Sequence, residues 1–217
     1  MTSELPTGDS RRVLLKAAAI LLGYPGEGLD SLLDEMRPDV ERSDEPAAAQ
    51  LLAAIVALRA LPPDVREASY VATFDFNEAH ALYLTAHELG DSRRRGQALL
   101  DLRAVLRAAG FEPPEGELPD HLPLLIEFVA AVPPDVDTTP LERRLAAVCA
   151  QVHAALVEED PYWPVLAALC ALLPAAEPEN AHVETGSAPR RPSRRPRFPL
   201  HERADTAELP YPLRYEE

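Results

Sequence analysis

The sequence has few cysteines, few glycines and no long apolar run. Among 217 residues there are two cysteines, Cys149 and Cys170, and nine glycines. The cysteines lie in apolar helical patterns, so we expect buried small hydrophobic residues and neither a disulfide framework nor a zinc site. The glycines form no phosphate-binding loop. No stretch reaches the ~18 apolar residues that span a bilayer, and the run 13–22 is broken by Lys16. We expect a chain of the cytoplasm with no inserted helix.

Positive charge is also scarce. The formal net charge is -15, and lysine occurs once among 21 basic residues. Residues 1–174 carry 28 acidic and 14 basic side chains, whereas residues 175–217 carry 8 and 7. Such an acidic body disfavours nucleic acid and anionic membranes as main partners and favours cationic ones. The arginines between 190 and 197 are flanked by acids, so a solvated tail is favoured over a nucleic-acid site.

Apolar residues recur at helical spacing along most of the chain, and no stretch alternates with the period of a strand. The fold class is therefore all-α, with about nine helices in one compact bundle over residues 1–174. Residues 175–217 are rich in Pro, Arg and Glu and are expected to form a disordered tail, because they have little apolar material to offset the entropy of ordering.

Several helix ends are marked by capping residues. We predict a first helix that begins at Asp9 or Ser10 and ends at a left-handed Gly23. A fifth helix is predicted from Asn77 to Gly90, carrying both His80 and His87. Asp91 is expected to cap a long sixth helix, whose first turns contain Arg93, Arg94 and Arg95.

The segment 117–128 is the most informative part of the sequence. Asp120 is predicted to cap a helix whose first turn holds Pro123. Glu127 follows seven positions after Asp120 and so returns to the same helix face. Capping explains neither Glu127 nor His121, so we interpret this helix mouth as a binding surface.

Two kinds of chemistry are disfavoured by spacing. His80 and His87 are seven residues apart, about 10 Å along one helix, too far to share a metal ion in the usual way. Asp120 and His121 are neighbours that point about 100° apart, a poor geometry for an acid–base dyad, and no nucleophile motif accompanies them. We therefore expect no metal, no cofactor and no catalysis.

Arg93, Arg94 and Arg95 oppose the macrodipole of the helix they open. Pairing with acidic residues of a neighbouring helix is the favoured explanation. Contact with an acidic patch of a partner is the alternative.

Four strings give the chain a family resemblance. They are Phe74-Asp75, His80-Ala-Leu-Tyr-Leu, Gly90-Asp-Ser-Arg-Arg-Arg-Gly-Gln-Ala-Leu and Glu117-Leu-Pro-Asp-His-Leu-Pro-Leu-Leu-Ile-Glu-Phe. With Leu21-Leu22-Gly23-Tyr24-Pro25 they resemble the NarJ family of molybdoenzyme chaperones over most of residues 10–173. Its relatives in the same group are the chaperones of TMAO and DMSO reductases.

The resemblance implies an all-helical, non-catalytic assembly factor of the cytoplasm, monomeric or weakly dimeric. Such a protein binds the apo catalytic subunit of respiratory nitrate reductase, including its N-terminal segment. It keeps the subunit competent for insertion of the molybdenum cofactor and iron–sulfur clusters, delays membrane docking and is absent from the mature enzyme. The alternatives are a chaperone of a DMSO or TMAO reductase and a helical adaptor for another basic amphipathic segment.

A basic amphipathic client segment would lie in a helix-lined groove while the acidic body attracts its cations. We expect this groove between the fifth and seventh helices. The predicted client-binding residues are Asp75, His80, Tyr83, Leu84, Asp120, His121, Pro123, Leu124, Glu127 and Phe128.

Overall fold

The computed structural model describes residues 7–174, with side chains from residue 10 onward. These residues form nine α-helices and one short 3₁₀ helix, and they contain no strand. The all-α prediction is thus confirmed, whereas the predicted disordered tail, residues 175–217, lies outside the described residues. No helix within 7–174 is long and apolar enough to cross a bilayer. The elements are α1 (Thr7–Leu21), α2 (Leu29–Glu41), α3 (Pro46–Ala60), α4 (Pro63–Phe74), η1 (Glu78–His80), α5 (Leu84–Leu89), α6 (Arg94–Ala108), α7 (Leu122–Ala131), α8 (Thr139–Ala155) and α9 (Trp163–Leu172).

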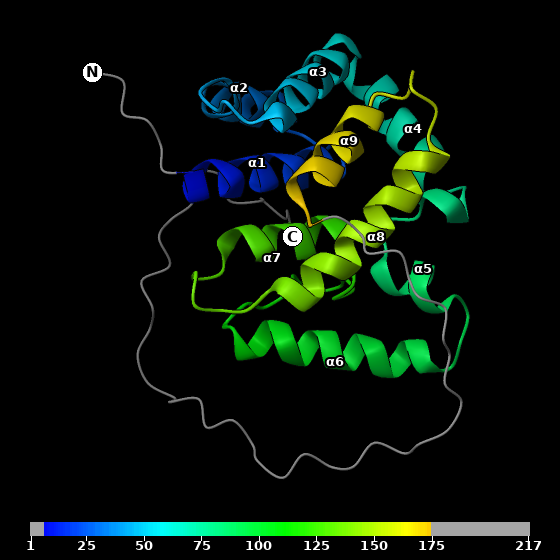
Figure 1. Cartoon of the computed structure of the whole chain (residues 1–217). Helices are drawn as coiled ribbons and strands as arrows, with labels where there is room; N and C mark the ends of the chain where they lie inside the picture. Colours follow the sequence, from blue (N-terminus) through cyan, green and yellow to red (C-terminus); the bar gives the residue numbers. More distant parts are fainter. Residues whose placement is uncertain (1–6, 175–217) are drawn as a thin grey trace.

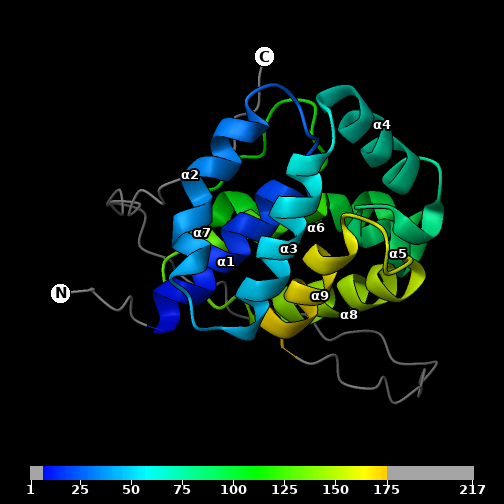
Figure 2. The ribbon, with the colours of Figure 1, turned by 90° about the horizontal axis from the view of Figure 1, so that it is seen from above.

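Helix α1 is the centre of the bundle. Every residue from Leu14 to Leu22 is buried, the pattern of a helix that is covered on all sides. It packs most extensively against α7 and also touches α2, α3 and α9 (Figure 1). Figure 2 shows the same central position from above, with α4 and α5 at the periphery. Helix α6 lies along the outer edge of the bundle, below α7 in Figure 1.

Three basic side chains of α1 reach its neighbours. Arg12 donates to the carbonyl oxygens of Ala130, Ala131 and Val132, at 2.7, 3.0 and 2.9 Å, and so caps the C-terminal end of α7. The sole lysine, Lys16, is 4% exposed and pairs with Glu127 of α7. Arg11 donates to Leu172 O and pairs with Glu142. These contacts fix α7 on the core helix.

Several predicted helix ends are corrected. Helix α1 already begins at Thr7, so neither Asp9 nor Ser10 is its cap. Gly23 does not adopt the left-handed conformation. A Cβ atom added at this position would lie 3.3 Å from Ile20 O, which is a tight contact. Asp91 does not cap α6, because Arg93 is the residue at its N-cap position.

The predicted fifth helix is broken into two pieces. Asn77 caps only the single turn η1, where its Oδ1 accepts a hydrogen bond from Ala79 N, and α5 begins afresh at Leu84. His80 and His87 therefore lie on different elements. Both cysteines were expected to be buried. Cys149 is buried, but Cys170 is exposed, so the expectation was wrong for Cys170.

Candidate functional site

Asp120 is fully buried, and its carboxylate serves a different helix from the predicted one. The N-cap residue of α7 is His121, and no side chain caps that end. Asp120 Oδ2 instead accepts hydrogen bonds from Thr85 N at 3.2 Å and Thr85 Oγ1 at 2.5 Å, in the first turn of α5. Asp120 was correctly predicted to cap a helix, but the helix that it caps is α5 and not α7. The reason is that the folded chain brings the start of α5 beside residue 120.

Short backbone pairing holds this junction together. Leu84 N donates to Asp120 O and Leu122 N donates to Leu82 O, which places Tyr83 opposite His121 in an isolated antiparallel bridge. The bridge connects the start of α5 to the start of α7. It also stacks the rings of Tyr83 and His121, whose centroids lie 5.4 Å apart.

The other carboxylate oxygen, Asp120 Oδ1, is buried without a hydrogen-bond partner within the described residues. The nearest cation is Arg95, whose Nη2 lies 3.8 Å from Oδ2 and whose Nε donates to Thr85 Oγ1 at 3.1 Å. A buried carboxylate oxygen left unpaired is costly. The junction thus has unused capacity to accept one donor.

His121 is largely covered, since its side chain is 13% exposed. Burial lowers the pKa of the imidazole below its usual 6.5, while the charges of Glu117 and Asp120 act in the opposite direction. Its Nδ1 lies 3.5 Å from Glu117 Oε2 without the geometry of a hydrogen bond. His121 therefore faces Glu117 and Tyr83, whereas Asp120 faces Thr85, so the two side chains do not share a proton as a dyad would.

Tyrosines and carboxylates from four parts of the chain surround this junction. Tyr24 is 57% exposed; its hydroxyl donates to Glu67 at 3.3 Å and its ring packs edge-on against Tyr70. Burial, together with the charge of Glu67 and then of Asp75, raises the pKa of Tyr24. We call the following set the acidic rim: Tyr24, Glu67, Asp75, Tyr83, Glu117 and His121.

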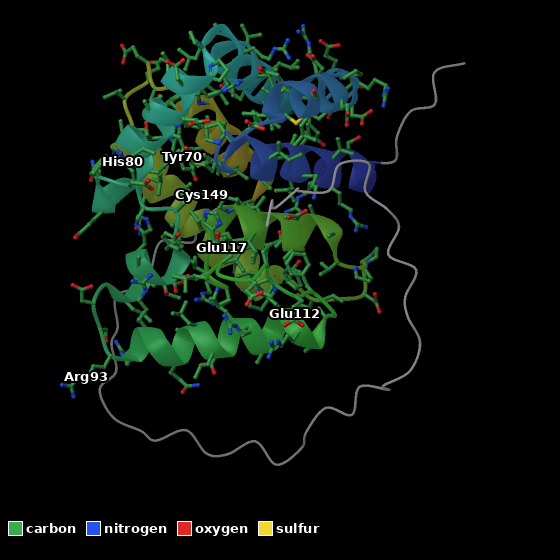
Figure 3. All side chains as sticks on the ribbon, turned by 180° about the vertical axis from the view of Figure 1, so that it is seen from behind. Tyr70, His80, Arg93, Glu112, Glu117 and Cys149 are labelled. Carbon is green, nitrogen blue, oxygen red and sulfur yellow. The ribbon has the colours of Figure 1, made fainter. Side chains whose placement is uncertain are left out.

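Asp75 and Glu117 each act electrostatically on more than one tyrosine at or beside the acidic rim. Burial and the charges of Glu117, Asp120 and Asp75 raise the pKa of Tyr83. Burial chiefly raises the pKa of Tyr70 as well, with contributions from Asp75 and Glu117. Figure 3 shows Glu117 below Tyr70, on the side where α4 faces the loop before α7. The rim thus offers hydrogen-bonding aromatic rings beside several carboxylates, an arrangement suited to a cationic segment.

The predicted site residues divide by burial. Asp75 is exposed, and Tyr83, His80 and His121 are partly accessible. Leu84, Leu124 and Phe128 are at most 1% exposed and belong to the core. Pro123 and Glu127 are buried too, and Glu127 is engaged by Lys16. Contact between a client peptide and any of these residues stays a prediction. The buried residues could touch a peptide only if the helices that cover them moved apart.

His80 ties helix ends together. Its Nδ1 lies 3.0 Å from Thr73 O and its Nε2 lies 3.2 Å from Ala155 O, so the ring joins the C-terminal ends of α4 and α8. Within residues 7–174, no group of three or more His, Cys, Asp or Glu side chains is arranged to hold a metal ion.

The structure adds residues that the sequence-based site omitted. Tyr24, Glu67 and Glu117 join the acidic rim, and Thr85 and Arg95 support Asp120. Tyr24 and Glu117 both lie in the strings that carried the family resemblance, which could have flagged them. Nothing in the local pattern pointed to Glu67, because its role depends on α4 packing beside the 23–25 turn.

Comparison with known proteins decides the family. Residues 38–159, more than half of the chain, match the family model described as nitrate reductase delta subunit. The chain belongs to the nitrate reductase delta subunit family.

Over the aligned regions, curated relatives are about one third identical to the chain. The nitrate reductase-like protein NarX of Mycobacterium tuberculosis is 33% identical over 164 residues, which cover 76% of this chain but only 25% of the relative. A probable nitrate reductase molybdenum cofactor assembly chaperone, NarJ of Bacillus subtilis, is 32% identical over 64% of this chain and 76% of its own length. NarJ of Escherichia coli, a nitrate reductase molybdenum cofactor assembly chaperone, is 34% identical over 67% of this chain and 63% of its own.

Proposed function

We propose that this chain is a non-catalytic chaperone for assembly of the molybdenum cofactor into nitrate reductase. The observation that carries the proposal is the similarity to two proteins named for that task, over about two thirds of this chain. The family resemblance of residues 74–128 agrees with it. Since the mycobacterial relative is four times as long as the matched region, its own activity is not transferred here.

The acidic rim gives the proposal a physical basis. A client segment that carries arginine or lysine beside apolar residues could place its cations against Glu67, Asp75 and Glu117. Its apolar side chains could stack on Tyr24 and Tyr83. The acidic body would speed the encounter with such a segment. We infer that the client is the apo catalytic subunit, bound through its N-terminal segment before the subunit docks at the membrane.

Asp120 and His121 contribute in different ways. Asp120 positions α5 and with it Tyr83, because its carboxylate caps the first turn of that helix. His121 stacks on Tyr83 and is held neutral by burial near pH 7. A neutral imidazole avoids repulsion of a cationic client. In this arrangement Asp120 is a positioning residue and His121 a contact residue.

The test is calorimetric titration of the full chain with a peptide that copies the N-terminal segment of the nitrate reductase catalytic subunit. The variant of interest is Glu67→Gln with Glu117→Gln, because both side chains are accessible and neither is needed for the core. The matched control is Asp135→Asn with Glu158→Gln, which removes the same charge from exposed positions that are not members of the rim. Circular dichroism verifies that each variant stays helical.

We expect micromolar or tighter binding by the wild type, about tenfold weaker binding by the rim variant and unchanged binding by the control. Equal weakening in both variants would mean that only net charge matters and would remove the rim from the proposal. To test specificity, the wild type is also titrated with a peptide from a DMSO-type reductase. Equal affinity for that peptide would favour a general molybdoenzyme chaperone, and no binding of either peptide would overturn client capture through this segment.

A further inference from the structure

The basic side chains of the described residues fall into two groups. Outside α6 and its N-cap residue, each arginine except Arg143, and also the lysine, forms an ion pair or donates to a carbonyl oxygen. The partnered side chains are Arg11, Arg12, Lys16, Arg37, Arg42, Arg59, Arg66 and Arg144. The acidic body thus neutralises nearly all of its own cations.

Helix α6 is the exception. Together with its N-cap residue it carries five arginines, of which Arg95 turns inward to Thr85 and Asp120 and Arg107 pairs with Glu112. Arg93, Arg94 and Arg103 are exposed, and their side chains form no ion pair or hydrogen bond with other described residues. Unpaired cations therefore gather on one helix of a protein whose formal net charge is -15.

Packing does not explain this arrangement. Arginines at the first turn of a helix oppose the macrodipole and therefore lower the stability of that helix. Arg95 is compensated by Asp120, as the sequence predicted for this cluster, but Arg93 and Arg94 are not. A feature that costs stability without an internal partner is a candidate for an external one.

The surroundings of these arginines form a continuous outer surface. Only Leu102 and Leu106 of α6 are buried. Helical periodicity places Arg93, Leu100 and Arg107 on the side away from them, and Arg103 at the flank of the same surface. Leu100 is 61% exposed. Figure 3 shows Arg93 directed away from the body at one end of α6, with Glu112 at the other. We call Arg93, Leu100, Arg103 and Arg107 the α6 basic face.

A cavity extends this face at its C-terminal end. It has a volume of about 440 Å³ and is lined by Arg103 and Arg107 of α6 and by residues 112–116 of the following loop. Arg107 is held in place by two hydrogen bonds to Glu112 Oε1, at 3.1 and 2.6 Å, whereas Arg103 is free to bind a carboxylate. The cavity is large enough for several side chains.

We propose that the α6 basic face is a second docking surface of the chaperone, for an acidic segment of the same client protein. This proposal rests on the proposed function for the identity of the client. The face is about 22 Å long, the length of a 15-residue helix, which suits a short acidic segment. Nucleic acid and an anionic membrane are extended polyanions that would also meet Glu112, Glu115 and the acidic body behind the face, whereas a short acidic segment can be confined to the exposed arginines. The two surfaces of opposite charge then fix the orientation of the client.

The test compares two double charge reversals that change the net charge equally. Arg93→Glu with Arg103→Glu reverses the α6 basic face, and Arg37→Glu with Arg143→Glu reverses exposed arginines on α2 and α8. Each full-length protein is titrated with the apo catalytic subunit of nitrate reductase and, separately, with its N-terminal peptide. Vesicles containing phosphatidylglycerol are the third probe. Arg93→Glu favours the helix macrodipole, so misfolding of α6 is not expected.

The expected result is binding of the apo subunit about tenfold weaker for the α6 reversal, most pronounced at low salt, with the peptide affinity unchanged or higher. Equal affinity of both reversals for the apo subunit would overturn the second surface while leaving the proposed function intact. If the wild type bound the apo subunit but not the peptide, and the α6 reversal weakened subunit binding, the first site would be overturned and the second supported. Vesicle binding that depends on Arg93 and Arg103 would assign the face to a membrane and overturn the proposal, as would no binding of the subunit by the wild type.

Discussion

The two ends of α7 are held in different ways. At the C-terminal end Arg12 satisfies three carbonyl oxygens, and within the helix Glu127 is paired with Lys16. At the N-terminal end no side chain caps the helix. Asp120, just before it, serves α5 and keeps one oxygen without a partner, and His121 Nδ1 has no hydrogen bond.

We propose that this difference separates a stabilising end from a client-binding end along a single helix. Buried polar groups in folded proteins are normally satisfied, so unsatisfied ones gathered at one end are a place where a ligand can add bonds. Three members of the acidic rim, Tyr83, Glu117 and His121, lie at that same end. Changes at the Lys16 and Arg12 contacts should therefore act on folding, and changes at the rim on client affinity.

The largest effect is expected from Glu127→Gln, which leaves Lys16 buried without a counter-charge. Breaking one partner of a buried pair typically costs about 3–5 kcal/mol of unfolding free energy. Burial lowers the pKa of Lys16 in the wild type to about 8. The deficit should therefore be larger at pH 6, where the wild type keeps the charged pair that the variant loses, than well above pH 8, where Lys16 is neutral in both. Urea denaturation at both pH values measures it.

The control for this prediction is the double variant Lys16→Met with Glu127→Leu. Because apolar replacement of both partners removes the buried charge, it should recover most of the lost stability. If Glu127→Gln unfolded no more easily than wild type, the contrast between the two ends of α7 would be wrong at its strongest point.

Arg12→Met is expected to come next. It keeps part of the apolar stem but removes three hydrogen bonds at the negative end of α7, at a cost of about 1.5–3 kcal/mol. Peptide affinity of the folded variant should be unchanged. Arg37→Met, which removes an exposed pair within α2, should change the unfolding free energy by less than about 1 kcal/mol. A loss of affinity without a loss of stability in Arg12→Met would place binding at the wrong end of α7.

Much of the fold followed from the sequence because helices are encoded locally. Helix α3 is an example, because Pro46 stands at its first position and Pro62 and Pro63 follow its end at Ala60. The fifth helix was overestimated because periodic apolar residues continue through the break at residues 81–83. There the backbone pairs with residues 120–122, a contact distant in sequence that no local pattern reveals.

The site was predictable in its residue types but less so in its geometry. Asp120 and His121 do lie beside Tyr83, as expected of the helix mouth. Glu127 was placed on the same face by periodicity, yet that face turns toward α1, where a lysine 111 positions away meets it. Sequence spacing gives the face of a helix but not what covers it, and this is why several predicted contact residues belong to the core.

A smaller effect is expected from Asp120→Asn at the N-terminal end. The amide can still accept from Thr85 N but loses the charge that attracts Arg95, so the expected cost is about 1 kcal/mol. Hydrogen exchange should show loss of protection confined to α5, with α1 and α7 unaffected. The isosteric variant Thr85→Val removes the hydroxyl contact alone and should produce a weaker version of the same pattern. Loss of protection that spread to α7 would show that Asp120 holds the core as Glu127 does.

The smallest expected effect is on pH dependence through His121. Its pKa is lowered in the folded chain, so between the folded value and 6.5 the unfolded chain binds more protons. The His121 contribution to stability is therefore fully present above pH 6.5 and is lost as the pH falls through the folded pKa.

Client affinity should fall over the same window, because a charged imidazole repels a cationic segment. Wild type and His121→Gln are compared by peptide titration from about pH 5.5 to 8, a range that includes the ordinary titration of histidine. Parallel profiles would assign the pH dependence to other groups and reduce His121 to a stacking partner of Tyr83.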